Sequence, residues 1–295
     1  MSDIHPVIAV TGSSGAGTST VKTAFEHIFL RERATPCVVE GDSFHRYDRA
    51  EMRGHVETAL AEGRTVSHFG PEANHFDEIE TLFREYGETG TGKRRYYIHN
   101  DDEAARHGQT AGTFTLWEDI PEDTDLLFYE GLHGAVVNGK VNAARYADLL
   151  IGVVPIVNLE WIQKIHRDTA HRGYDASSVT ETILRRMYDY VHYITPQFSL
   201  TDINFQRVPT VDTSNPFIAR DIPTPDESYI VIRFKDPLKF GIDFPYLLAM
   251  LHDSFMSRRN TIVVPGGKMG LAIEIILAPI VEEMMQRRRR RVKAG

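Results

Sequence analysis

Cysteine is almost absent from this sequence, because Cys37 is the only one among 295 residues. A single thiol cannot form an intrachain disulfide, so redox control by an internal pair is excluded. Its position after Pro36, at the start of an apolar run, is typical of a buried and unreactive thiol. Structural zinc is excluded as well, since the histidines occur neither in an H-E-x-x-H motif nor in paired Cys/His spacing.

Long hydrophobic runs and an excess of basic residues are also lacking. The first apolar run is far too short for a membrane span, and no basic segment precedes it, so we predict a cytoplasmic protein with no membrane partner. A net charge of -8 argues against a nucleic-acid partner. The local exception is the run of five arginines at residues 287–291, which we interpret as a solvated helix end rather than an anion site.

Short apolar segments alternate with helical patterns along the chain. The apolar segments are partly β-branched, as in buried strands of a parallel sheet, and lie at residues 7–10, 37–39, 126–129 and 149–154. Helical patterns follow Thr18, Arg46, Asp77, Asn158 and Ser177. The predicted fold class is therefore α/β, a mixed and mostly parallel sheet with helices on both faces. Ligand sites are expected at the carboxyl ends of its strands.

Two regions depart from this alternation. Residues 64–120 are rich in His, Gly, Thr and charge, which predicts long functional loops around one or two short helices. Residues 208–211, 229–234 and 261–264 are predicted as extra edge strands, some of them antiparallel, before a last helix that starts near Lys268. Since there is no repeat or Gly/Ser linker, we predict a single domain over residues 1–295.

The first predicted strand leads into a glycine-rich loop with the spacing of a P-loop, G-x-x-x-x-G-K-S/T. Glycines let the backbone curl, so that its N–H groups and the following helix N-terminus surround a nucleotide phosphate. Ser19 supplies a hydroxyl for Mg²⁺. The predicted nucleotide-binding residues are Gly12, Ser13, Ser14, Gly15, Ala16, Gly17, Thr18, Ser19 and Thr20.

This loop lacks the usual lysine, because Thr18 stands in its place. Phosphoryl transfer depends on neutralising the phosphate charge, so other cations must supply it. Lys164, Arg167 and Arg172 are the candidates, and they accompany Asp168 on a predicted helix and its exit. Lys164 and Asp168 are four residues apart and can share one helix face. From spacing alone, a solvated face with an ion pair is an equal alternative.

Acidic residues follow two of the predicted strands. Asp42 comes after the second strand and can accept the proton of an attacking hydroxyl, bind Mg²⁺, or do both. The alternative role for Asp42 is a helix N-cap. His45 and Arg49 follow it and can hold an anionic acceptor. Glu130 ends a later apolar strand, where a Walker B carboxylate would meet Mg²⁺.

Three of these motifs together resemble the phosphoribulokinase and uridine kinase family. They are Gly-Ser-Ser-Gly-Ala-Gly-Thr-Ser-Thr at residues 12–20, Gly-Asp-Ser-Phe-His-Arg at 41–46, and Tyr-Glu-Gly-Leu-His at 129–133. Residues 83–90 and 97–100 are similar specifically to bacterial phosphoribulokinases. The resemblance covers nearly the whole chain.

The resemblance implies a P-loop kinase fold like that of nucleoside monophosphate kinases, with Mg-ATP on the P-loop and Ser19. It implies transfer of the γ-phosphate to the C1 hydroxyl of ribulose 5-phosphate, the Calvin-cycle step that yields ribulose 1,5-bisphosphate. Asp42 would be the base, and Asp42 and Glu130 would lie near the metal. The sugar phosphate would be bound by His45, Arg49, His99 and Arg172. Residues 164–172 would form a lid that brings Lys164, Arg167 and Asp168 to the phosphates.

The resemblance also bears on regulation. Plant-type relatives carry cysteine and lysine where this chain has Ala16 and Thr18, so thioredoxin-type control is not expected. Bacterial relatives are homo-oligomers activated by NADH, which implies an effector site at a subunit interface. Arg185 and Arg186 are candidates for that site, although a pair of surface helix charges is the favoured interpretation.

Two other functions stay open at this point. A uridine-kinase-like transfer to a nucleoside would require an aromatic base pocket rather than the His45 and Arg49 cations. A nucleotide-binding regulator without catalysis would explain the missing lysine, but it would need no base such as Asp42. The Gly266-Gly267-Lys268 segment resembles a second phosphate loop, yet without a following Ser or Thr we interpret it as a turn into a helix.

Overall fold

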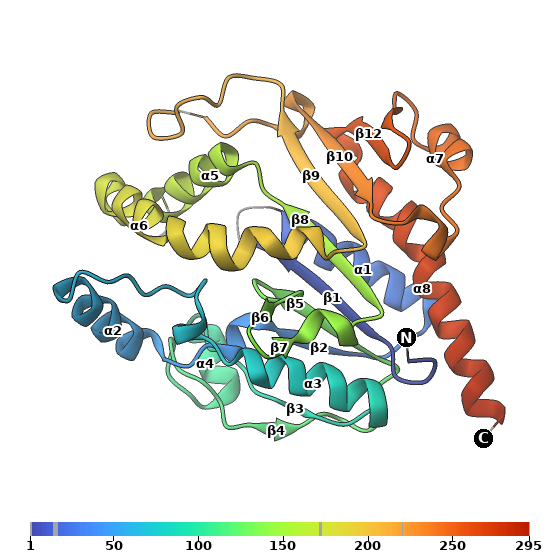
Figure 1. The fold of residues 1–295 in the computed structure, drawn as a ribbon, viewed down its shortest axis with the longest axis horizontal. Coiled ribbons are helices and arrows are strands. Elements are labelled where there is room, and N and C mark those ends of the chain that lie inside the picture. Colours follow the sequence, from blue (N-terminus) through green and yellow to red (C-terminus); the bar gives the residue numbers. More distant parts are fainter. Residues whose placement is uncertain (1, 14–16, 171–172, 220, 295) are drawn as a thin grey trace.

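The computed structural model describes residues 2–13, 17–170, 173–219 and 221–294 (Figure 1). Within these residues, eight strands form one sheet in the order β11-β12-β10-β9-β8-β1-β5-β2. Its strands are β1 Val7–Gly12, β2 Pro36–Glu40, β5 Leu126–Gly131, β8 Leu149–Val154, β9 Ile203–Pro209, β10 Ser228–Phe234, β11 Phe255–Arg258 and β12 Thr261–Pro265.

The central strand β1 is parallel to both of its neighbours. Val10 lies opposite Glu130 of β5 on one side and opposite Ile151 of β8 on the other. The strands β2 and β9 extend this parallel arrangement, whereas β10, β12 and β11 pair in antiparallel fashion at one edge. The carboxyl ends of β1, β2, β5 and β8 therefore meet at the same edge of the sheet, where the motifs of the sequence were expected to converge.

Helices cover both faces of this sheet (Figure 1). Alternate side chains of a strand point to opposite faces, so Ile8 and Val10 pack toward α1 (Thr18–Glu32) and α8 (Met269–Ala294). Val7 and Ala9 pack toward α3 (Phe76–Thr89) on the other face. The predicted α/β class, with helices on both faces and extra edge strands, is thus confirmed.

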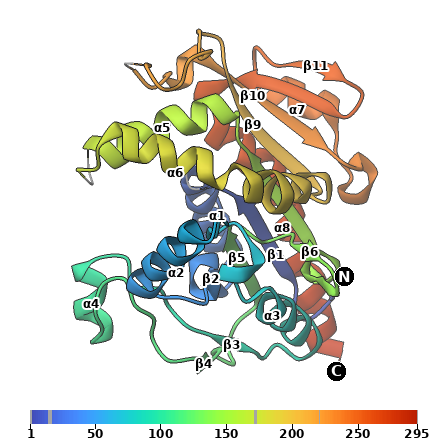
Figure 2. The same ribbon diagram turned by 60° about the vertical axis from the view of Figure 1, so that its left-hand side comes forward.

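The remaining elements lie around the sheet, some of them at the carboxyl ends of its central strands. In Figures 1 and 2, α5 and α6 lie on one side of this end of the sheet, and α2 lies on the other. The remaining helices are α2 Arg49–Ala61, α4 Asp101–His107, α5 Val157–Ala170, α6 Ala176–Asp189 and α7 Phe244–Met250. Two small two-stranded sheets pair β3 Lys93–Arg94 with β4 Glu118–Asp119, and β6 Val137–Asn138 with β7 Val141–Asn142. None of the helices in the described part of the chain is long and apolar enough to cross a membrane. That residues 1–295 form a single domain stays a prediction.

One predicted strand was misplaced. Residues 208–211 were expected to form an edge strand, but β9 runs from Ile203 to Pro209 and lies parallel to β8 inside the sheet. The apolar pattern of β9 is interrupted by the polar residue Asn204. Its burial is possible because it accepts a hydrogen bond from Thr201 and donates one to the Phe198 carbonyl. Pro209 then ends the strand, since proline has no N–H to continue the ladder.

The arginine run at residues 287–291 ties the end of α8 to the rest of the molecule. Arg288 forms a 2.8 Å ion pair with Asp125 and also donates to the Thr124 carbonyl. Arg291 pairs with Asp3 at 3.1 Å, and Arg289 donates to the Glu32 carbonyl at the end of α1. The interpretation as a solvated helix end is therefore correct only in part, because arginines of the run also form ion pairs or hydrogen bonds with three segments that are distant in the sequence.

Replacing Arg288 by Met should destabilise the fold. The side chain of Arg288 is only 20% exposed, and its loss leaves Asp125 and the Thr124 carbonyl without these bonds. We expect the free energy of unfolding to fall by about 1–2 kcal/mol in a urea titration. Arg290→Met is the matched control, since Arg290 is exposed and donates to a carbonyl of its own helix. Equal stability of the two variants would contradict this role.

Candidate active site

The P-loop follows β1 as predicted. Gly12 approaches β8 so closely that a Cβ would lie 2.9 Å from the Val153 carbonyl oxygen, which explains the requirement for glycine. Gly17 caps α1 in a left-handed conformation with φ 101°, and Thr18 is the first residue of the helix. Ser14, Gly15 and Ala16 lie outside the described residues, and of Ser19 only the backbone, within α1, is described. The strand and the helix that flank a P-loop are thus in place.

Carboxylates gather beside the start of α1. Glu130 lies at the end of β5, directly opposite Glu40 at the end of β2 and near Thr18 at the start of α1. Burial raises the pKa of Glu130, and the nearby carboxylates of Glu40 and Asp42 add to this effect. Lys22 of α1 opposes it and forms a 2.9 Å ion pair with Glu40. Three carboxylates thus lie near one lysine beside the start of α1.

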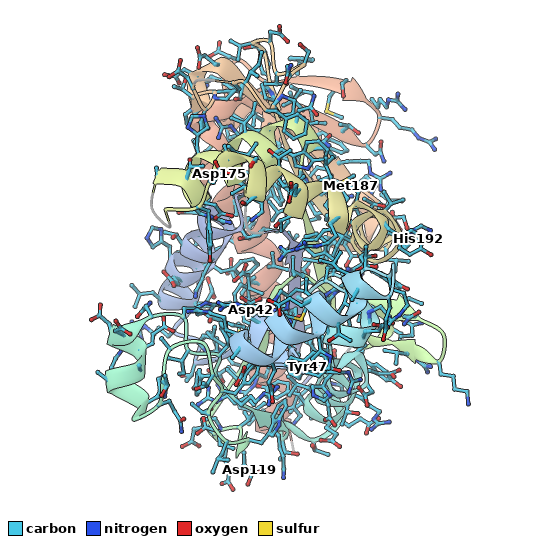
Figure 3. All side chains as sticks on the ribbon, turned by 90° about the vertical axis from the view of Figure 1, so that its left-hand side faces the viewer. Asp42, Tyr47, Asp119, Asp175, Met187 and His192 are labelled. Carbon is cyan, nitrogen blue, oxygen red and sulfur yellow. The ribbon has the colours of Figure 1, made fainter. Side chains whose placement is uncertain are left out.

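Asp42 lies in a single 3-10 turn, Gly41–Phe44, directly after β2. Its Oδ1 is 3.3 Å from Nε2 of His45, and 42% of its side chain remains exposed, so a substrate hydroxyl can reach it. Burial alone would raise the pKa of Asp42, but the hydrogen bond and charge of His45, with smaller contributions from His99 and His68, lower it to about 2. In Figure 3, Asp42 lies between α6, which carries Met187, and Tyr47 at the entrance to α2.

The alternative role of Asp42 as a helix cap is not supported. The residue that caps α2 is Asp48, whose carboxylate accepts from the backbone N–H groups of Ala50 and Glu51. Asp42 instead lies inside its short turn, and its carboxylate faces His45. The sequence pattern could not separate these two acids, because both precede helical segments.

The turn that carries Asp42 is held by Arg95, a residue that the sequence analysis did not identify. Its guanidinium donates to the carbonyls of Ser43 and His45, at 2.7 and 2.5 Å. The same group stacks over the rings of Phe114 and Trp117, at 3.9 and 4.7 Å from their centroids. Burial in this aromatic layer lowers the pKa of Arg95 to about 10. Arg95 thus fixes the backbone of the turn from outside the sheet.

His99, in the segment before α4, and Arg49, the first residue of α2, approach the same turn. Arg49 donates to the His99 carbonyl at 3.1 Å, and the His99 ring lies 3.8 Å from Glu40. The hydrogen bond to the Glu40 carboxylate raises the pKa of His99, and the negative charge of Asp42 acts in the same direction. The structure therefore brings Asp42, His45, His99 and Arg49 into one cluster, which is here called the acceptor cluster.

Lys164, Arg167 and Asp168 form a second cluster on α5, here called the lid cluster. The predicted ion pair is present, because Lys164 Nζ lies 2.5 Å from one oxygen of Asp168, and Arg167 Nε lies 3.0 Å from the other. Burial alone would raise the pKa of Asp168, but these two cations hold it below its ordinary value. Arg172, which was predicted to act with them, lies outside the described residues.

Near the lid cluster, one residue differs from its expected surface position and another had been given no role. Arg186 of α6 was expected to be a surface charge, but its guanidinium faces inward over the Phe69 ring, and burial lowers its pKa to about 10. Glu160 of α5 accepts a 3.2 Å hydrogen bond from the Tyr190 hydroxyl, and burial near Ser13 of the P-loop raises its pKa. Neither role could be found from spacing, since both depend on how α5 and α6 pack.

Residues 67–70 connect the two clusters. Ser67 donates a 2.7 Å hydrogen bond to Asp189 at the end of α6. The His68 ring lies 4.3 Å from that of His45, and burial, with added repulsion from His45 and Arg186, lowers its pKa to about 3. The segment therefore contacts the acceptor cluster on one side and the helices of the lid cluster on the other.

The sequence and fold of this chain are similar to those of named proteins. Residues 7–214 match the family described as "Phosphoribulokinase / Uridine kinase family". The chain belongs to this family. A relative from Cupriavidus necator, "Phosphoribulokinase, chromosomal", is 64% identical over 291 residues, which cover 98% of this chain and 99% of the relative. "Phosphoribulokinase" from Nitrobacter vulgaris is 62% identical over 287 residues, which cover 97% of this chain and 98% of that protein.

A solved structure supports the same family. The phosphoribulokinase from Rhodobacter spheroides matches with a TM-score of 0.89 and 58% sequence identity, covering 98% of this chain and 100% of the other. Family membership implies ATP with Mg²⁺ as the phosphate donor. Among the described residues, Glu130 and Asp42 fit a magnesium ion, which proteins usually hold through one or two carboxylates together with substrate phosphates.

Proposed function

We propose that the chain transfers the γ-phosphate of Mg-ATP to the C1 hydroxyl of ribulose 5-phosphate, producing ribulose 1,5-bisphosphate and ADP. The observation that carries this function is the position of the Asp42–His45 turn at the carboxyl end of β2, on the same edge of the sheet as the P-loop that follows β1. The names of relatives that match nearly the full chain support the same substrate.

A cavity beside the P-loop suits the nucleotide base. Its volume is about 240 Å³, and it opens next to Gly17. Its lining is mostly apolar or glycine, as at Leu159 of α5, Met269 of α8 and Gly266 in the turn before α8, and it also includes Glu160, Gln163 and Arg207. Gly266 has no room for a side chain, since a Cβ would meet the Pro225 carbonyl. The Gly266-Gly267 segment is thus a turn into α8, as expected, and it also forms one wall of the proposed base site.

The acceptor cluster performs the proton transfer. Asp42 accepts the C1 hydroxyl proton as that oxygen bonds to the γ-phosphorus and the bond from phosphorus to the β–γ bridging oxygen breaks. His45, Arg49, His99 and Arg172 bind the sugar phosphate. A bound Mg²⁺ would supply charge neutralisation beside the phosphates, held by Ser19, Asp42 and Glu130.

The lid cluster replaces the P-loop lysine. Lys164 and Arg167 supply positive charge to the transferred phosphoryl group, and Asp168 keeps both cations in place on one face of α5. Glu160, near Ser13, brings this helix close to the P-loop. The P-loop residues from Gly12 to Thr20 bind the remaining phosphates through their backbone N–H groups.

ADP release from Mg-ATP tests this function directly. Rapid release should occur with ribulose 5-phosphate and not with uridine or without an acceptor. Release with uridine would instead assign the chain to nucleoside phosphorylation. Binding of ATP without release in any mixture would support a regulator.

Arg49→Ala should impair the use of ribulose 5-phosphate specifically. The exposed guanidinium of Arg49 can bind the sugar phosphate, because its one hydrogen bond among the described residues is to the His99 carbonyl of the same cluster. Loss of a charge-assisted contact should raise the KM for ribulose 5-phosphate by about 10-fold or more, with little change in the KM for ATP. Initial-rate measurements with each substrate varied in turn would show the difference. An equal rise in both KM values would assign Arg49 another role.

Activation by NADH and assembly into a homo-oligomer stay predictions. The inward-facing Arg186 suits an anion close to the lid cluster. Arg185 precedes it on α6 and is half-buried. The activation can be checked by adding NADH to the ADP-release assay, and the oligomer by light scattering.

A further inference from the structure

Asn74 lies next to His45, although the two residues are 29 positions apart in the sequence. A short antiparallel bridge joins them, with hydrogen bonds from His75 N to the Phe44 carbonyl and from Arg46 N to the Ala73 carbonyl, both 2.8 Å. The side chain of Asn74 is buried, with 1% of the residue exposed, and its Oδ1 lies 2.7 Å from Nδ1 of His45. The sequence analysis gave Asn74 no role.

The neighbours of Asn74 determine which way its amide faces. Its Nδ2 lies 2.8 Å from the His68 carbonyl and 2.7 Å from the Gly70 carbonyl, and both of these groups can only accept hydrogen bonds. The amide nitrogen must therefore face residues 68–70, and its oxygen must face His45. Since that oxygen is an acceptor, Nδ1 of His45 has to carry the hydrogen.

This arrangement leaves Nε2 as the ring atom that faces the site. Nε2 lies 3.3 Å from Oδ1 of Asp42. If the His45 ring were rotated by 180°, a ring carbon would face Asn74 in place of Nδ1–H, and the hydrogen bond to Asn74 would be lost. We infer that Asn74 is a positioning residue, which acts through His45 by fixing the ring so that Nε2 points at Asp42 and the bound sugar phosphate. The inference rests on the function proposed above, in which His45 contacts the acceptor.

A double-mutant cycle with His45 tests this role. In the wild-type background, Asn74→Ala should lower kcat/KM for ribulose 5-phosphate by about 10-fold, the effect of one lost buried hydrogen bond. The KM for ATP should stay within about twofold. In the His45→Ala background, the same substitution should change kcat/KM by less than about twofold, because its target is gone. A similar loss in both backgrounds would overturn the inference and indicate a purely structural role.

Asn204→Ala is the matched control. Asn204 is also a buried asparagine that bonds through both amide atoms, to Thr201 and to the Phe198 carbonyl, in the interior of the sheet. Both variants should lower the melting temperature, but only Asn74→Ala should change kcat/KM for ribulose 5-phosphate. If Asn204→Ala reduces it as much, the effect of Asn74→Ala reflects stability alone.

A measurement on the wild-type protein keeps the test independent of folding and of activity. In ¹⁵N-histidine NMR, the His45 signals, assigned by their loss in His45→Ala, should show a proton on Nδ1. A ring that carries its proton on Nε2 alone would overturn the inference. Failure of the wild type to use ribulose 5-phosphate would overturn the proposed function and leave this spectroscopic result unaffected.

Discussion

Asp42→Asn should reduce kcat by about 10² to 10⁴-fold, because a sugar hydroxyl is a poor nucleophile and a positioned base contributes an effect of that size. Asparagine preserves the shape of the side chain but cannot accept a proton. Binding of a fluorescent ATP analogue should remain almost unchanged, since the P-loop is intact. Stopped-flow or coupled measurements of kcat, made beside a melting curve, would separate lost chemistry from lost folding.

Asp48→Asn is the matched control for this variant. Asp48 caps α2 only six residues further along the chain, and asparagine caps helices as well as aspartate does. The control should therefore retain both its activity and its stability. An active and normally stable Asp42→Asn enzyme would leave the base hypothesis without support.

The low pKa of Asp42 predicts how activity depends on pH. His45 holds the pKa of Asp42 near 2, below its ordinary value, so the carboxylate stays ionised and ready to accept a proton as the pH falls through 4. Protonation of Asp42 should thus limit kcat only below about pH 3, provided that the protein remains folded. If the kcat of the wild type falls near pH 4 and this fall is absent in Asp42→Asn, the pKa of Asp42 is not lowered and the prediction is wrong.

Lys164→Met should lower kcat by about 10²-fold or more, a loss of about 3 kcal/mol in transition-state stabilisation. The P-loop has Thr18 in place of lysine, and Lys164 lies on α5 with its ammonium group 2.5 Å from Asp168. Removing it takes away positive charge where negative charge develops on the transferred phosphoryl group. Single-turnover kinetics at saturating Mg-ATP would measure the chemical step itself.

The control for Lys164→Met must also break a half-buried ion pair. Lys239→Met does so, since Lys239 pairs with Asp202 at 2.7 Å and both side chains are similarly shielded. Its melting temperature should fall about as much as that of Lys164→Met, with kcat unchanged. A Lys164→Met enzyme with nearly normal kcat would show that another cation, such as Arg186, takes the place of the P-loop lysine.

Local sequence patterns predicted much of this site. Glycine spacing located the P-loop, strand ends located Asp42 and Glu130, and four-residue spacing located the Lys164–Asp168 pair. Each of these features depends on residues within a few positions of one another. Such features follow from the geometry of one strand, turn or helix, so they are visible before the fold is known.

The residues that support the site could not be predicted in this way. Asn74 and Arg95 bond to the Asp42–His45 turn from 29 and 50 positions away, and neither has a local pattern. Arg186 looked like a surface charge because its burial depends on Phe69, a residue of a distant loop. The polar Asn204 similarly hid β9, since its partners become apparent only once the sheet has formed.

The central position of β1 has a consequence for how the chain is made. Although it is the first strand synthesised, both of its partners, β5 and β8, come much later, and the face it shares with α1 is completed only by α8. An apolar strand with two open edges therefore persists while α1 to α4 are being translated. Such nascent segments are the species that aggregate or that chaperones bind, and non-local pairing of this kind folds slowly. Yields in heterologous expression should accordingly depend on chaperone supply and on slow translation.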